Sequence, residues 1–162
     1  MTPQDMMLTV ALKSWNQALD RATQMFSNLT DEELQAEVAP GRNRLIYLWG
    51  HLAATNDSLI ATLRLGQRLH PELDAIFLKA PDKTVAELPS AAELKRVWEE
   101  INANLTPALA QLTADQWLER HASVSEEDFA KEPHRNRFAI LLSRTNHLGF
   151  HLGQVVLTKK RA

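Results

Sequence analysis

Two histidines near the C-terminal end of the chain have a spacing suited to metal binding. His147 and His151 lie four residues apart in an apolar segment. In a helix this spacing places two imidazoles on one face, on successive turns, where both can reach one ion. Two packed or surface histidines would show the same spacing. The zincin motif of metalloproteases is excluded, because it requires Glu directly after the first histidine and Leu148 stands there.

A third histidine strengthens the metal hypothesis. On the predicted C-terminal helix, one stripe contains Ile140, Arg144, His147, His151, Gln154 and Thr158. His51 lies at the edge of the apolar face of an earlier predicted helix. If the two helices are antiparallel, His51 and His151 share one depth, since each is about eight residues, or roughly 12 Å, from the same end. The sequence therefore predicts one divalent metal site at His51, His147 and His151.

Such a site would have chemistry of its own. Three neutral imidazoles leave a position open for water or substrate, which is typical of catalytic rather than structural sites. An ion there lowers the pKa of a bound water or thiol, or polarises a carbonyl. The chain has no cysteine, so any thiol would be diffusible and any protein ligand a nitrogen or oxygen. Metal affinity should fall as pH drops through the imidazole pKa of about 6.5.

Two further residues on the C-terminal stripe are candidates for a role beside the metal. Gln154 and Arg144, each about one turn from a histidine, could orient a ligand or bind an anionic substrate. A solvated helix edge would also explain both. Asp57 points away from the histidine stripe and is expected at the surface or an interface. His70, His121 and His134 lie in predicted loops and are expected to be exposed, whereas the four tryptophans are expected in the core.

Apolar residues at helical spacing predict four long helices. These helices span Pro3 to about Asn28, about Asn43 to Leu65, about Ala91 to Leu109, and about Arg137 to Lys159. Short helical turns are predicted after Thr30, around Leu73 to Leu78 and after Thr113, where capping residues or apolar runs occur. Residues 123–136 are polar and are expected to be irregular.

No convincing strand pattern occurs, so an all-α four-helix bundle is the expected fold, with residues 1–162 as a single domain. The short link between the first two long helices favours an antiparallel pair. The long crossover between the second and third, which contains Pro71, Pro81 and Pro89, permits parallel neighbours. Together these links predict an up-down-down-up bundle.

Composition limits the classes of partner. The 162 residues include 18 Lys plus Arg and 20 Asp plus Glu, without a long block of either sign, so nucleic acid is not an expected partner. No apolar run approaches the roughly 18 residues that span a bilayer, and the N-terminus lacks the pattern of a signal peptide. A cytoplasmic protein that does not contact membranes is expected.

Two motifs resemble a known family. The segments His147-Leu-Gly-Phe-His151-Leu-Gly-Gln154 and Leu48-Trp-Gly-His51-Leu are similar to motifs of the DinB/YfiT-like superfamily of bacterial four-helix metalloproteins. The resemblance covers nearly the whole chain. It implies an up-down-down-up bundle, a three-histidine site that holds zinc or nickel, and a homodimer.

The resemblance also implies a set of activities. Some relatives use low-molecular-weight thiols such as mycothiol, bacillithiol or glutathione to transfer or isomerise small molecules, and others are described as metal-dependent hydrolases. A thiol-dependent S-transferase or a hydrolase acting on a small-molecule substrate is therefore expected. The alternatives are a metal- or ligand-binding bundle without turnover, since no carboxylate stands on either histidine stripe, and a structural dimer with residual histidines.

A homodimer is also expected from the residues themselves. The C-terminal helix is apolar on nearly every side, and its residues outside the core face are Phe138, Leu142, Phe150, Val156 and Leu157. Burial of part of this surface against a second copy would remove it from water.

Overall fold

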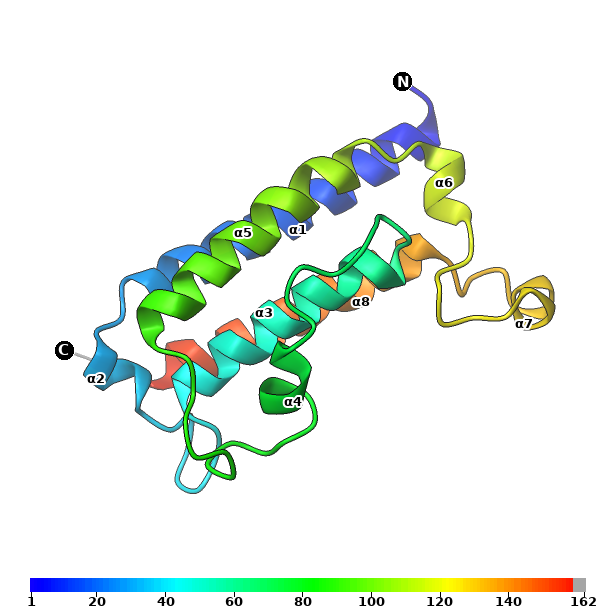
Figure 1. Cartoon of the computed structure of the whole chain (residues 1–162). Coiled ribbons are helices and arrows are strands. Elements are labelled where there is room, and N and C mark those ends of the chain that lie inside the picture. The colour runs from blue at the N-terminus through cyan, green and yellow to red at the C-terminus, as the bar shows by residue number, and fades with distance from the viewer. Residues whose placement is uncertain (159–162) are drawn as a thin grey trace.

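The computed structural model describes residues 1–158, which fold into eight helices without any strand (Figure 1). The four long helices are α1 (Pro3–Ser27), α3 (Leu45–Thr62), α5 (Ala91–Ala110) and α8 (Arg137–Thr158). The four short ones are α2 (Asp31–Leu34), α4 (Leu73–Phe77), α6 (Ala114–Leu118) and α7 (Glu126–Lys131). The all-α prediction is confirmed.

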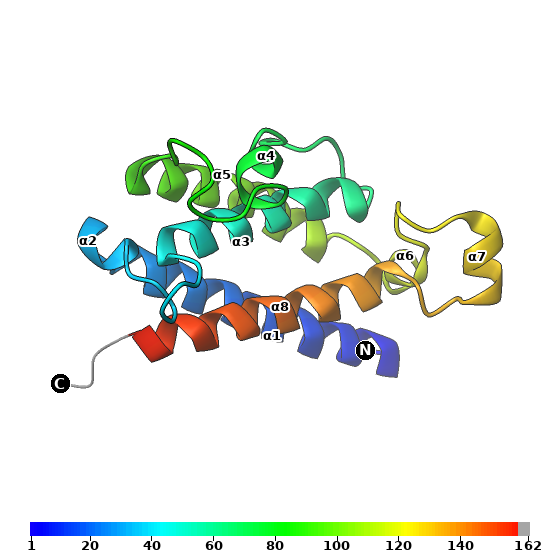
Figure 2. The same cartoon turned by 90° about the horizontal axis from the view of Figure 1, so that it is seen from below.

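The long helices form two layers. α1 and α8 lie side by side and run in the same direction, and α3 and α5 form the second pair (Figures 1 and 2). α3 runs opposite to α8, so residues early in α3 lie level with residues late in α8 (Figure 2). The two histidine-bearing helices are thus antiparallel, which is the condition under which His51 and His151 share one depth.

Capping residues explain where several helices begin. The Thr2, Thr30, Ser90 and Thr113 side chains each accept a hydrogen bond from the residue three positions later, whose own side chain accepts from the capping backbone. Such capping boxes satisfy backbone groups that the first turn of a helix leaves unpaired. They account for α1, α2, α5 and α6 beginning close to the positions that the sequence predicts.

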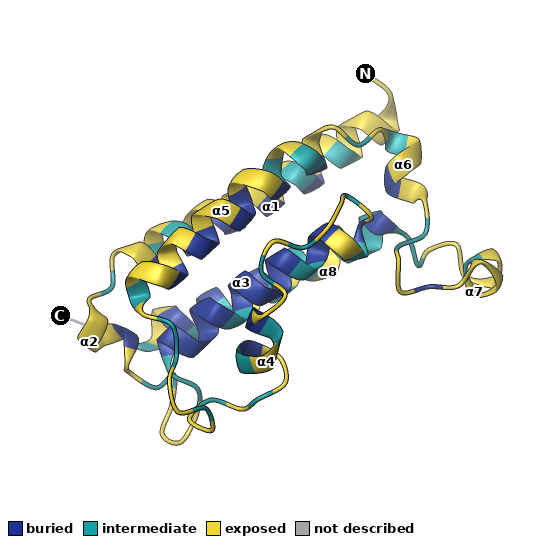
Figure 3. Ribbon diagram, viewed as in Figure 1, coloured by how far each residue is buried: buried dark blue, intermediate teal, exposed yellow. Residues whose placement is uncertain are grey.

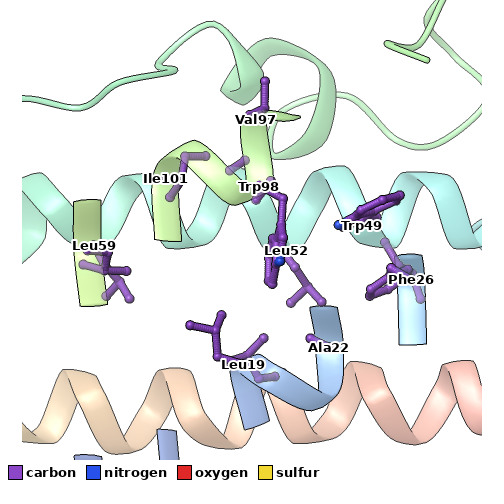
Figure 4. Packing of buried hydrophobic residues seen from close by; sticks show 14 of the residues in the cluster. Leu19, Ala22, Phe26, Trp49, Leu52, Leu59, Val97, Trp98 and Ile101 are labelled. Atoms are coloured by element: carbon purple, nitrogen blue, oxygen red, sulfur yellow. The ribbon is translucent and has the colours of Figure 1, made fainter. Parts of the chain in front are cut away.

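The core lies between the layers. α3 is buried along most of its length, whereas α1, α5 and α8 each turn one face to solvent (Figure 3). Figure 4 shows Leu19 and Ala22 of α1 close to Leu52 of α3 and Trp98 of α5. All four tryptophans are buried, which confirms the prediction that they pack in the core. The Trp49 ring stacks on Phe26 with 5.4 Å between centroids.

Two sequence-based assignments differ from the structure. Residues 123–136 were expected to be irregular, which is wrong, because α7 forms where Ser125 caps a first turn of acidic residues. α3 is shorter than predicted, whereas α5 matches its predicted range and contains Pro107 in its interior. The predicted helix end at Lys159 lies outside the described residues.

The crossover between α3 and α5, residues 63–90, is fastened to α3 by a buried carboxylate. Asp57 was expected at a surface or interface, which is wrong, because its side chain is fully buried. It accepts hydrogen bonds from Arg68 Nε at 2.9 Å and from the backbone N–H groups of Leu69 and His70 at 2.8 and 3.1 Å. Arg68 also pairs with Asp74 of α4. The carboxylate tolerates burial because its oxygens are paired.

Within residues 1–158, no helix combines the length and apolar character that crossing a membrane requires.

Candidate metal site

The structure brings the three predicted histidines together. Nε2 of His147 lies 3.1 Å from Nε2 of His51 and 3.0 Å from Nε2 of His151. Around a tetrahedral zinc ion with Zn–N bonds of about 2.0–2.1 Å, neighbouring nitrogens would lie roughly 3.3–3.4 Å apart. The observed distances are within a few tenths of an ångström of that value. The cluster is therefore compatible with a divalent metal site.

Hydrogen bonds orient two of the imidazoles. Nδ1 of His51 lies 2.9 Å from the backbone carbonyl oxygen of Phe77, and Nδ1 of His151 lies 2.7 Å from Oε1 of Gln154. Both oxygens only accept hydrogen bonds, so each Nδ1 carries the proton and donates it. The lone pair of each neutral ring is then on Nε2, which faces the cluster. In known metal sites, a hydrogen bond from the other ring nitrogen of a ligating histidine usually fixes the tautomer in this way.

The donor set itself indicates a cation. Nε2 of His51 and Nε2 of His151 both present lone pairs toward Nε2 of His147. A neutral His147 can donate at most one proton from that atom, so at least one lone pair stays without a donor inside the cluster. A metal ion that accepts all three lone pairs resolves this conflict, and the residues present fit such an ion.

The imidazoles are held in their neutral, metal-binding form. Burial, followed by the neighbouring histidines and Arg144, lowers the pKa of His147 to about 4. Burial also lowers the pKa of His51 and of His151, although the hydrogen bonds to Phe77 and Gln154 oppose it. A bound cation would therefore compete with few protons at neutral pH.

The contact between α4 and α3 explains the position of His51. A Cβ atom on Gly50 would overlap the ring of Phe77, so only glycine allows this ring to pack here. The Tyr47 hydroxyl donates a hydrogen bond to the carbonyl of Ala80 at 2.6 Å, which ties the chain after α4 to the same helix. These contacts hold the Phe77 carbonyl within hydrogen-bond distance of His51 Nδ1. Sequence reasoning missed Gly50 and Phe77; the signal was a glycine inside a helix, which costs stability unless another group approaches closely.

Gln154 and Arg144 have different surroundings. Gln154 lies beside His151, as its position on the stripe predicts, and its Oε1 accepts the hydrogen bond described above. Arg144 is half-buried on the same face of α8, one turn before His147, and its charge lowers the pKa of both His51 and His147. Within residues 1–158, no carboxylate lies within ion-pair distance of its guanidinium.

A groove of about 570 Å³ adjoins the histidines on the Gln154 side. It lies between α8 and the loop that precedes α3, and its lining residues are Val38, Ala39, Arg42, Asn43, Leu48, Phe150, His151, Gln154 and Leu157. The exposed Phe150 ring packs edge-on against His151, with 5.1 Å between ring centroids. A small molecule with an apolar portion could reach His151 through this groove.

The other three histidines are apart from the cluster. His134 is exposed, as expected, but His70 and His121 are half-buried, so the expectation that they are exposed is wrong. The ring nitrogens of His70 lie 2.9 Å from Glu72 and 3.2 Å from Glu100, which links the crossover to α5. Nδ1 of His121 accepts a hydrogen bond from the backbone of Ser123.

Comparison with known proteins agrees with the geometry. A solved crystal structure of a conserved protein from Enterococcus faecalis superposes with a TM-score of 0.63 over 93% of both chains, at 21% sequence identity, which indicates a shared fold. No curated protein matches the chain. The sequence profile of the DinB superfamily matches residues 14–155, a range that contains all three clustered histidines. The resemblance seen in the two histidine motifs is thus confirmed, and the chain belongs to the DinB superfamily.

Proposed function

We propose that this protein binds one divalent metal ion through Nε2 of His51, His147 and His151. The observation that carries the proposal is the convergence of these atoms, with two of the rings already oriented by Phe77 and Gln154. Zinc and nickel are the candidate ions, because imidazole nitrogen suits both.

The proposed activity is that of a metal-dependent enzyme acting on a small molecule, as a thiol-dependent S-transferase or a hydrolase. The ion would supply Lewis acidity, which lowers the pKa of a bound water or thiol and polarises a carbonyl. Phe77 and Gln154 hold the imidazoles, and the groove beside Phe150 would bind the substrate. Since the chain has no cysteine, the thiol of a transferase would be a diffusible cofactor.

One observation favours a second candidate, a metal- or ligand-binding bundle without turnover. The candidate cluster within residues 1–158 consists of histidines alone, with no Asp or Glu among its members. A hydrolase usually positions a general base close to the reacting water. A screen of metal-loaded protein with small thiols and electrophilic acceptors, and with simple esters and amides, distinguishes the two candidates.

The assembly and the topology belong to the same proposal. The directions of α1, α3, α5 and α8 support an up-down-down-up bundle with the long crossover between α3 and α5. Leu142 and Val156 of α8 are exposed, as are Met6, Met7 and Val10 of the adjacent α1, which supports a homodimer through this layer. We place the protein in the cytoplasm.

Titration calorimetry with zinc and with nickel tests the metal site. We expect His51→Ala, His147→Ala and His151→Ala each to lower the affinity by more than about a hundredfold, because two imidazoles cannot complete the set. His134→Ala, at an exposed histidine, is the matched control and should bind like the wild type. Wild-type affinity in His51→Ala would remove α3 from the site and overturn the proposal.

A further inference from the structure

Arg144 is a cation in a location that disfavours it. Its side chain is half-buried, and burial lowers its pKa because the charged guanidinium loses water. In proteins a desolvated arginine is normally paired with a carboxylate. Among residues 1–158, Arg144 has no such partner.

The position of Arg144 is also unfavourable for binding of a metal ion at the three histidines. Residues three apart on a helix lie on the same face, which places Arg144 next to His147. Nε2 of His147 lies 3.1 Å from Nε2 of His51 and 3.0 Å from Nε2 of His151, so Arg144 lies on the face of α8 that would carry the ion. Its positive charge would repel a divalent cation bound to those nitrogens. Arg144 therefore costs both folding stability and metal affinity.

The charge balance of the site indicates what would offset this cost. A dication held by three neutral imidazoles, with a guanidinium beside it, makes a strongly positive site, and the described part of the chain, residues 1–158, adds no carboxylate to the cluster. A small anion bound there would be attracted by both charges. Arginine suits this role because its planar fork donates two parallel hydrogen bonds to a carboxylate or similar oxyanion.

We propose that the Arg144 guanidinium binds the carboxylate, or a comparable oxyanion, of a small molecule held at the metal site. The substrate or cofactor is then an anion. This inference rests on the proposed function, because it requires the metal to be present.

The test uses a matched pair of thiols on full-length protein loaded with cobalt(II), whose visible absorption reports ligand binding. The pair is 3-mercaptopropionate and its neutral amide, 3-mercaptopropanamide, which have the same length and the same thiol. For the wild type we expect the acid to bind about ten- to a hundredfold more tightly than the amide, the range of one charge-assisted hydrogen-bonded pair. In Arg144→Gln this preference should disappear.

Three controls make the result specific. Arg144→Lys, which keeps the charge but not the fork, should retain part of the preference. Arg21→Gln, which removes an exposed positive charge from α1, should retain all of it. Cobalt affinity in Arg144→Gln should be equal to or higher than that of the wild type, which also shows that the variant is folded.

Two results would overturn the inference while leaving the metal site intact. One is an equal affinity of the wild type for acid and amide. The other is a preference that persists in Arg144→Gln, since the carboxylate would then bind the metal itself. A wild-type protein that takes up no cobalt would overturn the proposed function and the inference together, and this outcome is read before any thiol is added.

Discussion

The backbone carbonyl of Phe77 accepts a hydrogen bond from Nδ1 of His51 at 2.9 Å, although the two residues lie on different helices. The ring of the same phenylalanine covers Gly50, the residue before His51. The ring of Phe77 thus fixes the position of α4 on α3, and the backbone carbonyl of Phe77 fixes the tautomer of His51. Packing of α4 on α3 and metal affinity should therefore be linked.

Replacement of Gly50 tests this link. In Gly50→Ala the new methyl group overlaps the Phe77 ring, so α4 must move away from α3. We expect a loss of about 1–3 kcal/mol in the free energy of unfolding, together with weaker zinc binding. Gly149→Ala is the matched control, because a Cβ there meets nothing within 4 Å and should add up to about 1 kcal/mol of helix stability. Denaturant unfolding and calorimetry measure both effects; a fully stable Gly50→Ala protein would refute the linkage.

Gln154 should contribute to metal affinity without contributing much to stability. Its Oε1 accepts the hydrogen bond that keeps the proton of His151 on Nδ1. Gln154→Ala leaves this ring free to change tautomer, and we expect zinc affinity to fall by about ten- to a hundredfold. Gln24→Ala, at an exposed position of α1, should bind zinc like the wild type. Equal affinities of the two variants would show that Gln154 is only a surface residue.

The lowered pKa values change the expected pH dependence. Three imidazoles with unperturbed pKa values would lose about a thousandfold in metal affinity between about pH 7.5 and about pH 5.5. Because burial lowers all three pKa values, that of His147 to about 4, His147 drops out of this loss and the other two contribute less, so we expect a loss below about a hundredfold. Zinc competition with a chelator at the two pH values measures it. A thousandfold loss would mean that the rings are not buried as described.

The same shift predicts how the metal-free protein responds to acid. In the unfolded chain, His147 takes up a proton as pH falls below about 6.5, whereas in the folded chain it stays neutral until about pH 4. Its contribution to stability is therefore complete above pH 6.5 and is lost between these two values. Bound zinc should protect against this loss until the histidines are protonated. Unfolding curves across this range, with and without zinc, check the prediction.

Asp57 should be a large determinant of stability. Asp57→Asn removes the charge that pairs with Arg68 and leaves that guanidinium without one of its partners. We expect a loss of about 3 kcal/mol in the free energy of unfolding, because the carboxylate is fully buried. The control is Glu127→Gln, which breaks an exposed pair with Lys131 and should cause no measurable loss. Similar unfolding midpoints for both variants would contradict the role assigned to Asp57.

The proposed homodimer predicts a concentration-dependent mass. Leu142 and Val156 are 44% and 43% exposed on α8. If a second copy covers them, Leu142→Arg should shift the protein toward monomer in sedimentation velocity, because a charge in an apolar interface is costly. Leu69→Arg, at an exposed leucine of the crossover, should sediment like the wild type. A wild-type protein that is monomeric at every accessible concentration would exclude the dimer.

Several features of this protein are determined by short stretches of sequence. The starts of α1, α2, α5 and α6 follow from capping residues, whose hydrogen bonds span only three positions. The pairing of His147 with His151 follows from the helical repeat, and the level of His51 follows from its depth in an antiparallel helix. These features depend on local periodicity, which can be read along the chain.

Other features depended on which distant segments meet. The sequence around Asp57 resembles a solvated helix face, and only the return of Arg68 over α3 makes a buried carboxylate favourable there. Likewise, the acceptor for His51 is the backbone carbonyl of Phe77. Every residue has such a carbonyl, so the residue type at position 77 does not reveal the hydrogen bond. That Arg144 has no acidic partner among residues 1–158 was equally hidden, because the pairing of a charge is decided by the tertiary contacts of a long side chain.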